Sequence, residues 1–165
     1  MNYREIERKF LVRGDDYKEA AVRSYRICQW YLTREPGRTV RVRIRDSQAF
    51  LTIKGAADAS GMSRFEWERE IPMADAEALM TLKVSSVIDK RRFLVPFEGH
   101  TFEVDEFYGD NAGLTIAEVE LGSTGEQFGK PSWLGEEVTG DRRYYNSALS
   151  RKPYCEWKYE AEGGV

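Results

Sequence analysis

The sequence has little cysteine and histidine, and it has no long apolar segment. Its two cysteines, Cys28 and Cys155, lie far apart in the chain, and His100 is the single histidine. This composition argues against a structural zinc site and favours two free thiols in a reducing cytoplasm over a disulfide. No apolar run approaches the ~18 residues of a membrane span, and the N-terminus has no signal-like apolar stretch. We therefore expect a soluble, cytoplasmic protein with no membrane partner.

A large excess of one charge sign is also missing. The 25 basic and 28 acidic residues leave a formal net charge of −3, and the sequence pI is about 5.4. This balance gives no reason to expect nucleic-acid binding. No low-complexity segment or linker divides the 165 residues, so we expect one domain over residues 1–165.

Apolar and polar residues alternate along most of the chain, which is the period of a β-strand. The pattern predicts strands at 5–12, 26–33, 39–45, 49–54, 64–71, 87–97, 100–109 and 114–121. Helices are expected at 15–24, 75–83 and 142–150, the last capped by Asp141, after a loop at 131–141. Short turns between the strands favour antiparallel pairing. The predicted fold class is mainly β (α+β): a closed, eight-stranded antiparallel barrel flanked by helices.

The charged positions in these strands are sorted by sign. One face of each strand carries a basic row (Arg41, Arg43 and Arg45; Lys90 and Arg92) or an acidic row (Glu66, Glu68 and Glu70; Glu103 and Asp105; Glu118 and Glu120). The first strand places Glu5, Glu7 and Lys9 on one face. A solvated outer face would explain any one of these rows. Solvent faces usually mix residue types, so the sorted rows together favour a charged barrel interior.

A charged interior of this kind suits a polyphosphate with a divalent cation. Several cations in a restricted dielectric offset the charge of the anion, and arginine binds phosphate oxygens in a bidentate manner. The oxygen-rich pairs Glu5/Glu7 and Glu118/Glu120 suit Mg²⁺ or Mn²⁺, which would separate these carboxylates from the anion. The apolar backs of the strands would then face outward, beneath the helices at 15–24 and 75–83.

At these residues the sequence resembles the CYTH domain, or triphosphate tunnel metalloenzyme, superfamily. The matching segments are EIERK (5–9), RVR (41–43), TIK (52–54), EWERE (66–70), KRR (90–92), EVD (103–105), EVE (118–120) and EVTGDRRYYNSAL (137–149). The resemblance covers nearly the whole chain. It implies an eight-stranded tunnel that binds the triphosphate part of a substrate together with a divalent metal.

The resemblance also implies roles for individual residues. The metal-side carboxylates are Glu5, Glu7, Glu118 and Glu120, with Glu103 and Asp105 in a further acidic row. The substrate-binding cations are Lys9, Arg41, Arg43, Lys54, Lys90 and Arg92, joined by Arg142 or Arg143 from a C-terminal plug helix. Glu66, Glu68, Lys90 and Tyr31 are the candidate catalytic residues.

The resulting functional hypothesis is an enzyme with Mg²⁺ or Mn²⁺ as its cofactor. It would hydrolyse inorganic tripolyphosphate to pyrophosphate and phosphate, with ATP as a second candidate substrate, and it would act as a monomer or homodimer. Alternatives within the superfamily are a class IV adenylyl cyclase and a thiamine or nucleoside triphosphatase. A polyphosphate-binding module without activity and a purely structural β-domain are the alternatives from other classes.

Overall fold

The computed structural model describes residues 2–33 and 35–161. The strands are β1 (Arg4–Val12), β2 (Arg23–Tyr31), β3 (Arg38–Arg45), β4 (Gln48–Gly55), β5 (Ser63–Ile71), β6 (Ile88–Phe97), β7 (His100–Phe107), β8 (Thr115–Glu120) and β9 (Leu134–Glu137). The α-helices are α1 (Tyr17–Ala20), α2 (Met73–Leu79), α3 (Asn146–Leu149) and α4 (Lys158–Ala161). The 3-10 helices are η1 (Met80–Leu82), η2 (Gly109–Asn111), η3 (Arg142–Tyr144) and η4 (Tyr154–Glu156). No helix in the described part of the chain is long and apolar enough to cross a membrane.

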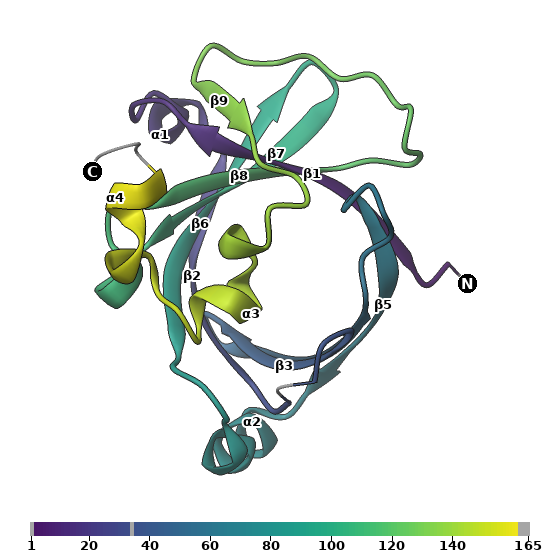
Figure 1. Cartoon of the computed structure of the whole chain (residues 1–165), viewed down its shortest axis with the longest axis vertical. Helices are drawn as coiled ribbons and strands as arrows, with labels where there is room; N and C mark the ends of the chain where they lie inside the picture. The colour runs from purple at the N-terminus through teal and green to yellow at the C-terminus, as the bar shows by residue number, and fades with distance from the viewer. Residues whose placement is uncertain (1, 34, 162–165) are drawn as a thin grey trace.

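The strands form a closed antiparallel barrel (Figure 1). The order is β5-β4-β3-β2-β6-β7-β8-β1, and β1 pairs again with β5 to complete the ring of eight strands. The closing contact is short, from Arg4 opposite Phe65 to Ile6 opposite Ser63. Figure 1 shows the small α3 helix within the outline of this ring, and α2 outside it. The predicted fold class is therefore confirmed.

Two of the three hydrophobic clusters among the described residues lie outside the ring, as the inside-out pattern predicts. Under α2, the buried side chains of Trp30, Val42, Ala49 and Ala76 pack together. A second cluster covers the backs of β1, β6, β7 and β8, and includes Tyr17 of α1 together with Trp133. The third cluster lies on the inward face at one end of the barrel, because Ile88, Phe107 and Ile116 share the faces of Lys90, Asp105 and Glu118. They pack there against Tyr144, Leu149 and Trp157 of the C-terminal segment. Because apolar packing occupies the outer face, the alternate side chains of the same strands point into the ring.

Three details of the sequence prediction need correction. The helix expected at 15–24 is a single turn, because Ala21 is extended (ψ 135°) and β2 begins at Arg23. The loop expected at 131–141 contains β9, whose Leu134 lies opposite Val12 of β1. The helix expected at 142–150 is interrupted at extended Tyr145 (ψ 135°), which separates η3 from α3. Two other expectations are confirmed, since Asp141 caps η3 through the N–H of Arg143 and both cysteines are free.

One edge of β1 is shared by β5 and β9, and two loops meet in the gap between them. β5 pairs with the start of β1, and β9 pairs with its end. In the gap, a Cβ on Gly61 would lie 2.4 Å from the Cα of Gly140. Both residues have positive φ angles, 76° and 82°. Glycine at both positions therefore permits the close approach that seals this side of the barrel.

Candidate active site

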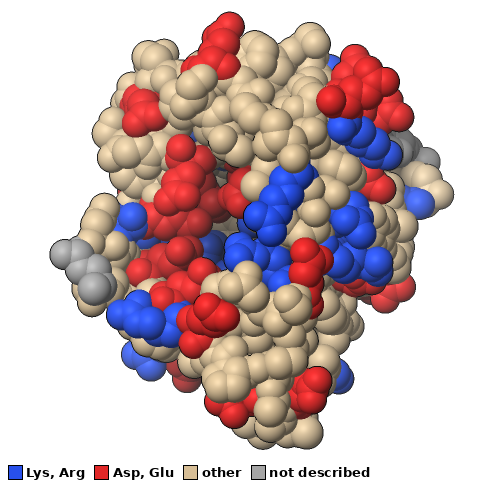
Figure 2. Space-filling model, turned by 180° about the vertical axis from the view of Figure 1, so that it is seen from behind, with Lys and Arg blue, Asp and Glu red and all other residues tan. Residues whose placement is uncertain are grey.

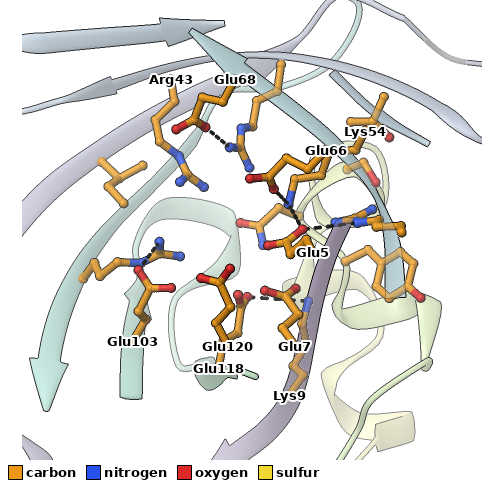
Figure 3. Close-up of a pocket in the computed structure, with 18 of the residues that line it drawn as sticks. Glu5, Glu7, Lys9, Arg43, Lys54, Glu66, Glu68, Glu103, Glu118 and Glu120 are labelled. Carbon is orange, nitrogen blue, oxygen red and sulfur yellow. Dashed lines mark hydrogen bonds and ion pairs between the residues drawn. The ribbon is translucent and has the colours of Figure 1, made fainter. Parts of the chain in front are cut away.

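The barrel encloses a cavity of about 210 Å³ with a strongly charged lining (Figure 3). Among the described residues, seven basic side chains line it: Lys9, Arg41, Arg43, Arg45, Lys54, Arg64 and Arg92. Seven glutamates line it as well: Glu5, Glu7, Glu66, Glu68, Glu103, Glu118 and Glu120. From outside, acidic side chains gather on one side of a hollow and basic side chains on the other (Figure 2). Members of each of the rows that sequence alternation sorted by sign are thus brought together around one space, although Glu70, Lys90 and Asp105 are not part of its lining.

The arginines of β3 and β6 form the basic wall, and each is held by polar neighbours. Arg41 donates to Thr52 Oγ1 at 3.1 Å and lies 3.5 Å from the carboxylate of Glu68. Arg43 donates through Nε to Gln29 Oε1 at 2.8 Å. Burial, together with the neighbouring Arg41, lowers the pKa of Arg43 to about 10. Fixed guanidinium groups of this kind bind an anion without first having to be ordered.

Arg92 and Lys54 lie between carboxylates. Arg92 donates to Glu103 at 2.9 Å on the cavity side. Lys54 Nζ is 2.7 Å from Glu5 and 2.9 Å from Glu66. Burial alone would raise the pKa of Glu5, but the charge of Lys54 outweighs it and the pKa is lowered. Glu5 is therefore ionised, and it joins β1, β4 and β5 across the closing seam of the barrel.

Three glutamates point toward one another on the opposite side (Figure 3): Glu7 from β1 and Glu118 and Glu120 from β8. Burial and the charges of Glu118 and Glu5 raise the pKa of Glu7 well above its usual range. Glu118 behaves differently. Burial raises its pKa, but the positive charges of Lys9 and Arg92 together outweigh the effect of burial, so the pKa of Glu118 is lowered overall. Mutual repulsion of this kind is relieved by a cation among the carboxylates.

These carboxylates fit a hard divalent cation by their chemistry, because all of their donor atoms are oxygens. Lys9 Nζ lies 3.7 Å from Glu118 and supplies positive charge beside these carboxylates. In the described residues, no three acidic, histidine or cysteine side chains have their ligand atoms already converged on one point. Glu5, Glu7, Glu118 and Glu120 thus provide the ligand type, and modest side-chain rotation would be needed to hold a shared ion.

Four predicted site residues do not line this cavity. Lys90 faces inward from β6, but α3 covers it: Nζ bonds to Asp105 at 2.7 Å and to Asn146 Oδ1 at 2.9 Å. Asp105 is 1% exposed and accepts two further hydrogen bonds from Arg92. Arg142 and Arg143 both lie outside the cavity, and Arg143 pairs with Asp141 at 2.7 Å. The roles given to these four residues stay predictions.

The remaining predicted residues do line the cavity, including Glu66, Glu68 and Tyr31. The structure adds lining residues that the sequence prediction did not assign: Tyr25, Ile27, Thr39, Arg45, Arg64, Tyr145, Asn146 and Ser147. Arg45 already belonged to the predicted basic row of β3 but was given no role in the site. Arg64 lies one alternate position before Glu66 in β5, so the strand period could have identified it. The residues from the 145–147 segment carry no such signal, because their position depends on how the C-terminal segment folds back.

A second cavity of about 500 Å³ adjoins the first at the α3 end. Tyr31, Tyr145 and Arg64 line both cavities. Arg142 and Arg151 add positive charge to the second one, whose lining also includes several glycines. The charged cavity therefore opens toward a larger chamber of mixed polarity.

The raised pKa of Glu7 has a consequence for stability. Because its pKa in the folded protein exceeds the ordinary value of 4.5, the free energy of unfolding falls as pH rises from that value through the raised pKa. Each unit of elevation contributes about 1.4 kcal/mol. In EDTA, we expect the wild type to lose more stability than Glu7→Gln between about pH 5.5 and 8. Urea unfolding at both pH values measures this, and parallel losses in the two proteins would contradict the assignment.

The fold and this lining define a class of protein, a closed β-barrel with a tunnel of opposed acidic and basic walls. The chain belongs to the CYTH family, whose domain model matches residues 3–151. Membership implies a divalent metal ion. The chain is 47% identical over 156 residues to an inorganic triphosphatase of Acetivibrio thermocellus, covering 94% of this chain and 98% of that protein.

Two further comparisons agree with the family assignment. An inorganic triphosphatase of Nitrosomonas europaea is 35% identical over 151 residues, covering 88% of this chain and 96% of that protein. A crystal structure described as an inorganic triphosphatase is 33% identical and superposes with a TM-score of 0.65, covering 88% of this chain and 97% of the other. The resemblance recognised in the sequence motifs is thereby confirmed.

Proposed function

We propose that this protein hydrolyses inorganic tripolyphosphate to pyrophosphate and phosphate inside the barrel. The observation that carries the proposal is the 210 Å³ cavity, which seven basic and seven acidic side chains line in the part of the chain that the structure describes. A short, highly charged anion needs many cations within a small volume of low dielectric. The two relatives described as inorganic triphosphatases match nearly the full length of the chain and support the same reaction.

In this proposal the basic wall holds the substrate. Arg41, Arg43 and Arg92 bind phosphate oxygens and stabilise the charge that moves to the leaving pyrophosphate. Lys9 and Lys54, both buried and facing acidic partners, bind further oxygens from the β1 and β4 sides. These side chains are ordered by their neighbours, so they orient the triphosphate for attack along the axis of the tunnel.

The acidic residues would hold Mg²⁺ or Mn²⁺ and position water. Glu5, Glu7, Glu118 and Glu120 are the candidate ligands, and a bound divalent ion would neutralise phosphate charge and lower the pKa of water. Glu68 accepts a hydrogen bond from Thr52 at 2.7 Å. Glu66 has a raised pKa because of burial. These two β5 carboxylates are therefore placed to orient the attacking water and to accept its proton.

The direct test is phosphate release from tripolyphosphate and from ATP, with Mg²⁺, Mn²⁺ or EDTA, while cyclic AMP is measured in the ATP reactions. We expect metal-dependent release with a preference for tripolyphosphate. Formation of cyclic AMP and pyrophosphate would instead assign a cyclase. Light scattering on the same preparation checks the prediction of a monomer or homodimer, and the expected cytoplasmic location stays a prediction.

A nucleoside triphosphate is the second candidate substrate. The observation that favours it is the 500 Å³ chamber of mixed polarity next to the charged cavity. A nucleoside could occupy that chamber while its triphosphate lies among the arginines. In the same assay, equal or faster phosphate release from ATP would favour this candidate.

A further inference from the structure

A chain of uncharged amides connects the buried ion pair to the basic wall. Lys90 donates to Asn146 Oδ1 at 2.9 Å, and Gln29 Nε2 donates to the same oxygen at 3.2 Å. Gln29 Oε1 in turn accepts from Arg43 at 2.8 Å. Gln29 and Lys90 are fully buried, whereas Asn146 is partly exposed and lines the charged cavity.

Two cations fix which way these amides point. Arginine and charged lysine only donate hydrogen bonds. Arg43 therefore requires the oxygen of Gln29, which turns Gln29 Nε2 toward Asn146. Lys90 likewise requires the oxygen of Asn146, and two donors then converge on that single oxygen. The amide nitrogen of Asn146 occupies the opposite corner of the planar group, away from Lys90.

The position of Asn146 determines what its nitrogen can contact. Lys90 is fully buried at the end of the barrel that α3 covers. Because the oxygen of Asn146 faces that covered end while the residue lines the cavity, its two N–H groups are presented to the cavity. An uncharged N–H donor is suited to a phosphate oxygen, and it adds no repulsion among the surrounding arginines.

We infer that Asn146 is a substrate-contacting residue: Lys90 and Gln29 hold its carboxamide oxygen, and its carboxamide nitrogen donates a hydrogen bond to a phosphate oxygen of bound triphosphate. This inference rests on the proposed function and adds a residue of the C-terminal segment to the site. It also gives the buried Lys90 a role, which is to orient a substrate contact rather than to bind phosphate itself.

The sharp test is Asn146→Asp compared with Asn146→Ala. Aspartate keeps an oxygen for Lys90 and Gln29 but replaces the N–H donor with a second oxygen, whose charge repels phosphate. We expect kcat/KM for tripolyphosphate with Mg²⁺ to fall about tenfold in Asn146→Ala, and at least another tenfold in Asn146→Asp. If Asn146 instead acts only through its oxygen, by holding Lys90 and Gln29 in place, Asn146→Asp will be more active than Asn146→Ala. That result overturns the inference.

Asn111→Ala is the matched control. Asn111 Oδ1 accepts from the N–H of Tyr154 at 2.8 Å, outside the charged cavity, so its loss should lower Tm and leave kcat/KM unchanged. Tm is measured for every variant. If Asn146→Asp does not fold, Asn146→Ala decides the question, because unchanged kcat/KM in that variant also overturns the inference.

The rise in Tm caused by tripolyphosphate separates this inference from the proposed function. Active wild type with an equally active Asn146→Asp overturns the inference alone. If the wild type is inactive but tripolyphosphate still raises its Tm, the proposed hydrolysis is overturned. In that case a smaller rise in Tm for Asn146→Asp than for the wild type supports the contact between Asn146 and phosphate. An equal rise in Tm overturns that contact. If wild type is neither active nor stabilised, both proposals fail.

Discussion

Replacing Glu7 by lysine should lower kcat/KM for metal-dependent tripolyphosphate hydrolysis by about 10³-fold or more. Glu7 lies opposite Glu120 of the neighbouring strand β8, and burial together with the charges of Glu118 and Glu5 raises its pKa. A lysine at this position removes a candidate metal ligand and places a cation where a divalent ion would otherwise bind. Phosphate release at several Mg²⁺ and Mn²⁺ concentrations measures the loss, which extra metal should not fully reverse.

The matched control is Glu77→Lys, which makes the same change of charge on the exposed side of α2. Because α2 lies outside the barrel (Figure 1), this variant should keep wild-type activity and metal dependence. Circular dichroism and Tm verify that both variants fold. Full activity in Glu7→Lys would show that the acidic side of the cavity does not take part in the reaction.

The charged interior could be predicted because a strand repeats every two residues. Arg41, Arg43 and Arg45 share a face, and all three line the cavity. The alternate Val42 of the same strand is fully buried on the outer side beneath α2. In this sheet the strand period alone decides which face a side chain occupies, so the sequence was sufficient.

Depth within the barrel could not be predicted in the same way. Lys90 and Arg92 share a face of β6, yet only Arg92 reaches the cavity, because α3 covers the level of Lys90. That coverage depends on the extended backbone of Tyr145, which turns the chain so that Asn146 enters the barrel. A local pattern carries no information about such a long-range contact.

The missed strand β9 has a similar cause. Its four residues, LGEE, show no apolar alternation that would distinguish them from a loop. The strand forms because β5 leaves β1 after Ile6, so the later part of that β1 edge is open for pairing. An unpaired edge offers free N–H and C=O groups to any segment that is held beside it. Here the geometry of closure, rather than strand propensity, decides the outcome.

Asp105→Ala should destabilise the protein by about 3–5 kcal/mol, as expected when one partner of a buried ion network is removed. Asp105 is 1% exposed and accepts hydrogen bonds from Lys90 and from two nitrogens of Arg92. Its loss leaves both cations without their buried counter-charge. For a chain of this length the loss corresponds to a fall of roughly 6–20 °C in Tm, which calorimetry and urea unfolding in EDTA both measure.

Asp89→Ala is the matched control for that change. Asp89 also binds an arginine through two hydrogen bonds, at 2.7 Å and 2.6 Å to Arg26, but this pair lies on the surface. Water and salt screen such a pair, so its removal should change stability little. If Asp105→Ala keeps its stability in EDTA but loses metal-dependent activity, Asp105 acts as a metal ligand, as its motif implies. A large loss of stability without metal would instead show that Asp105 serves to keep Lys90 and Arg92 charged and in place beside the substrate tunnel.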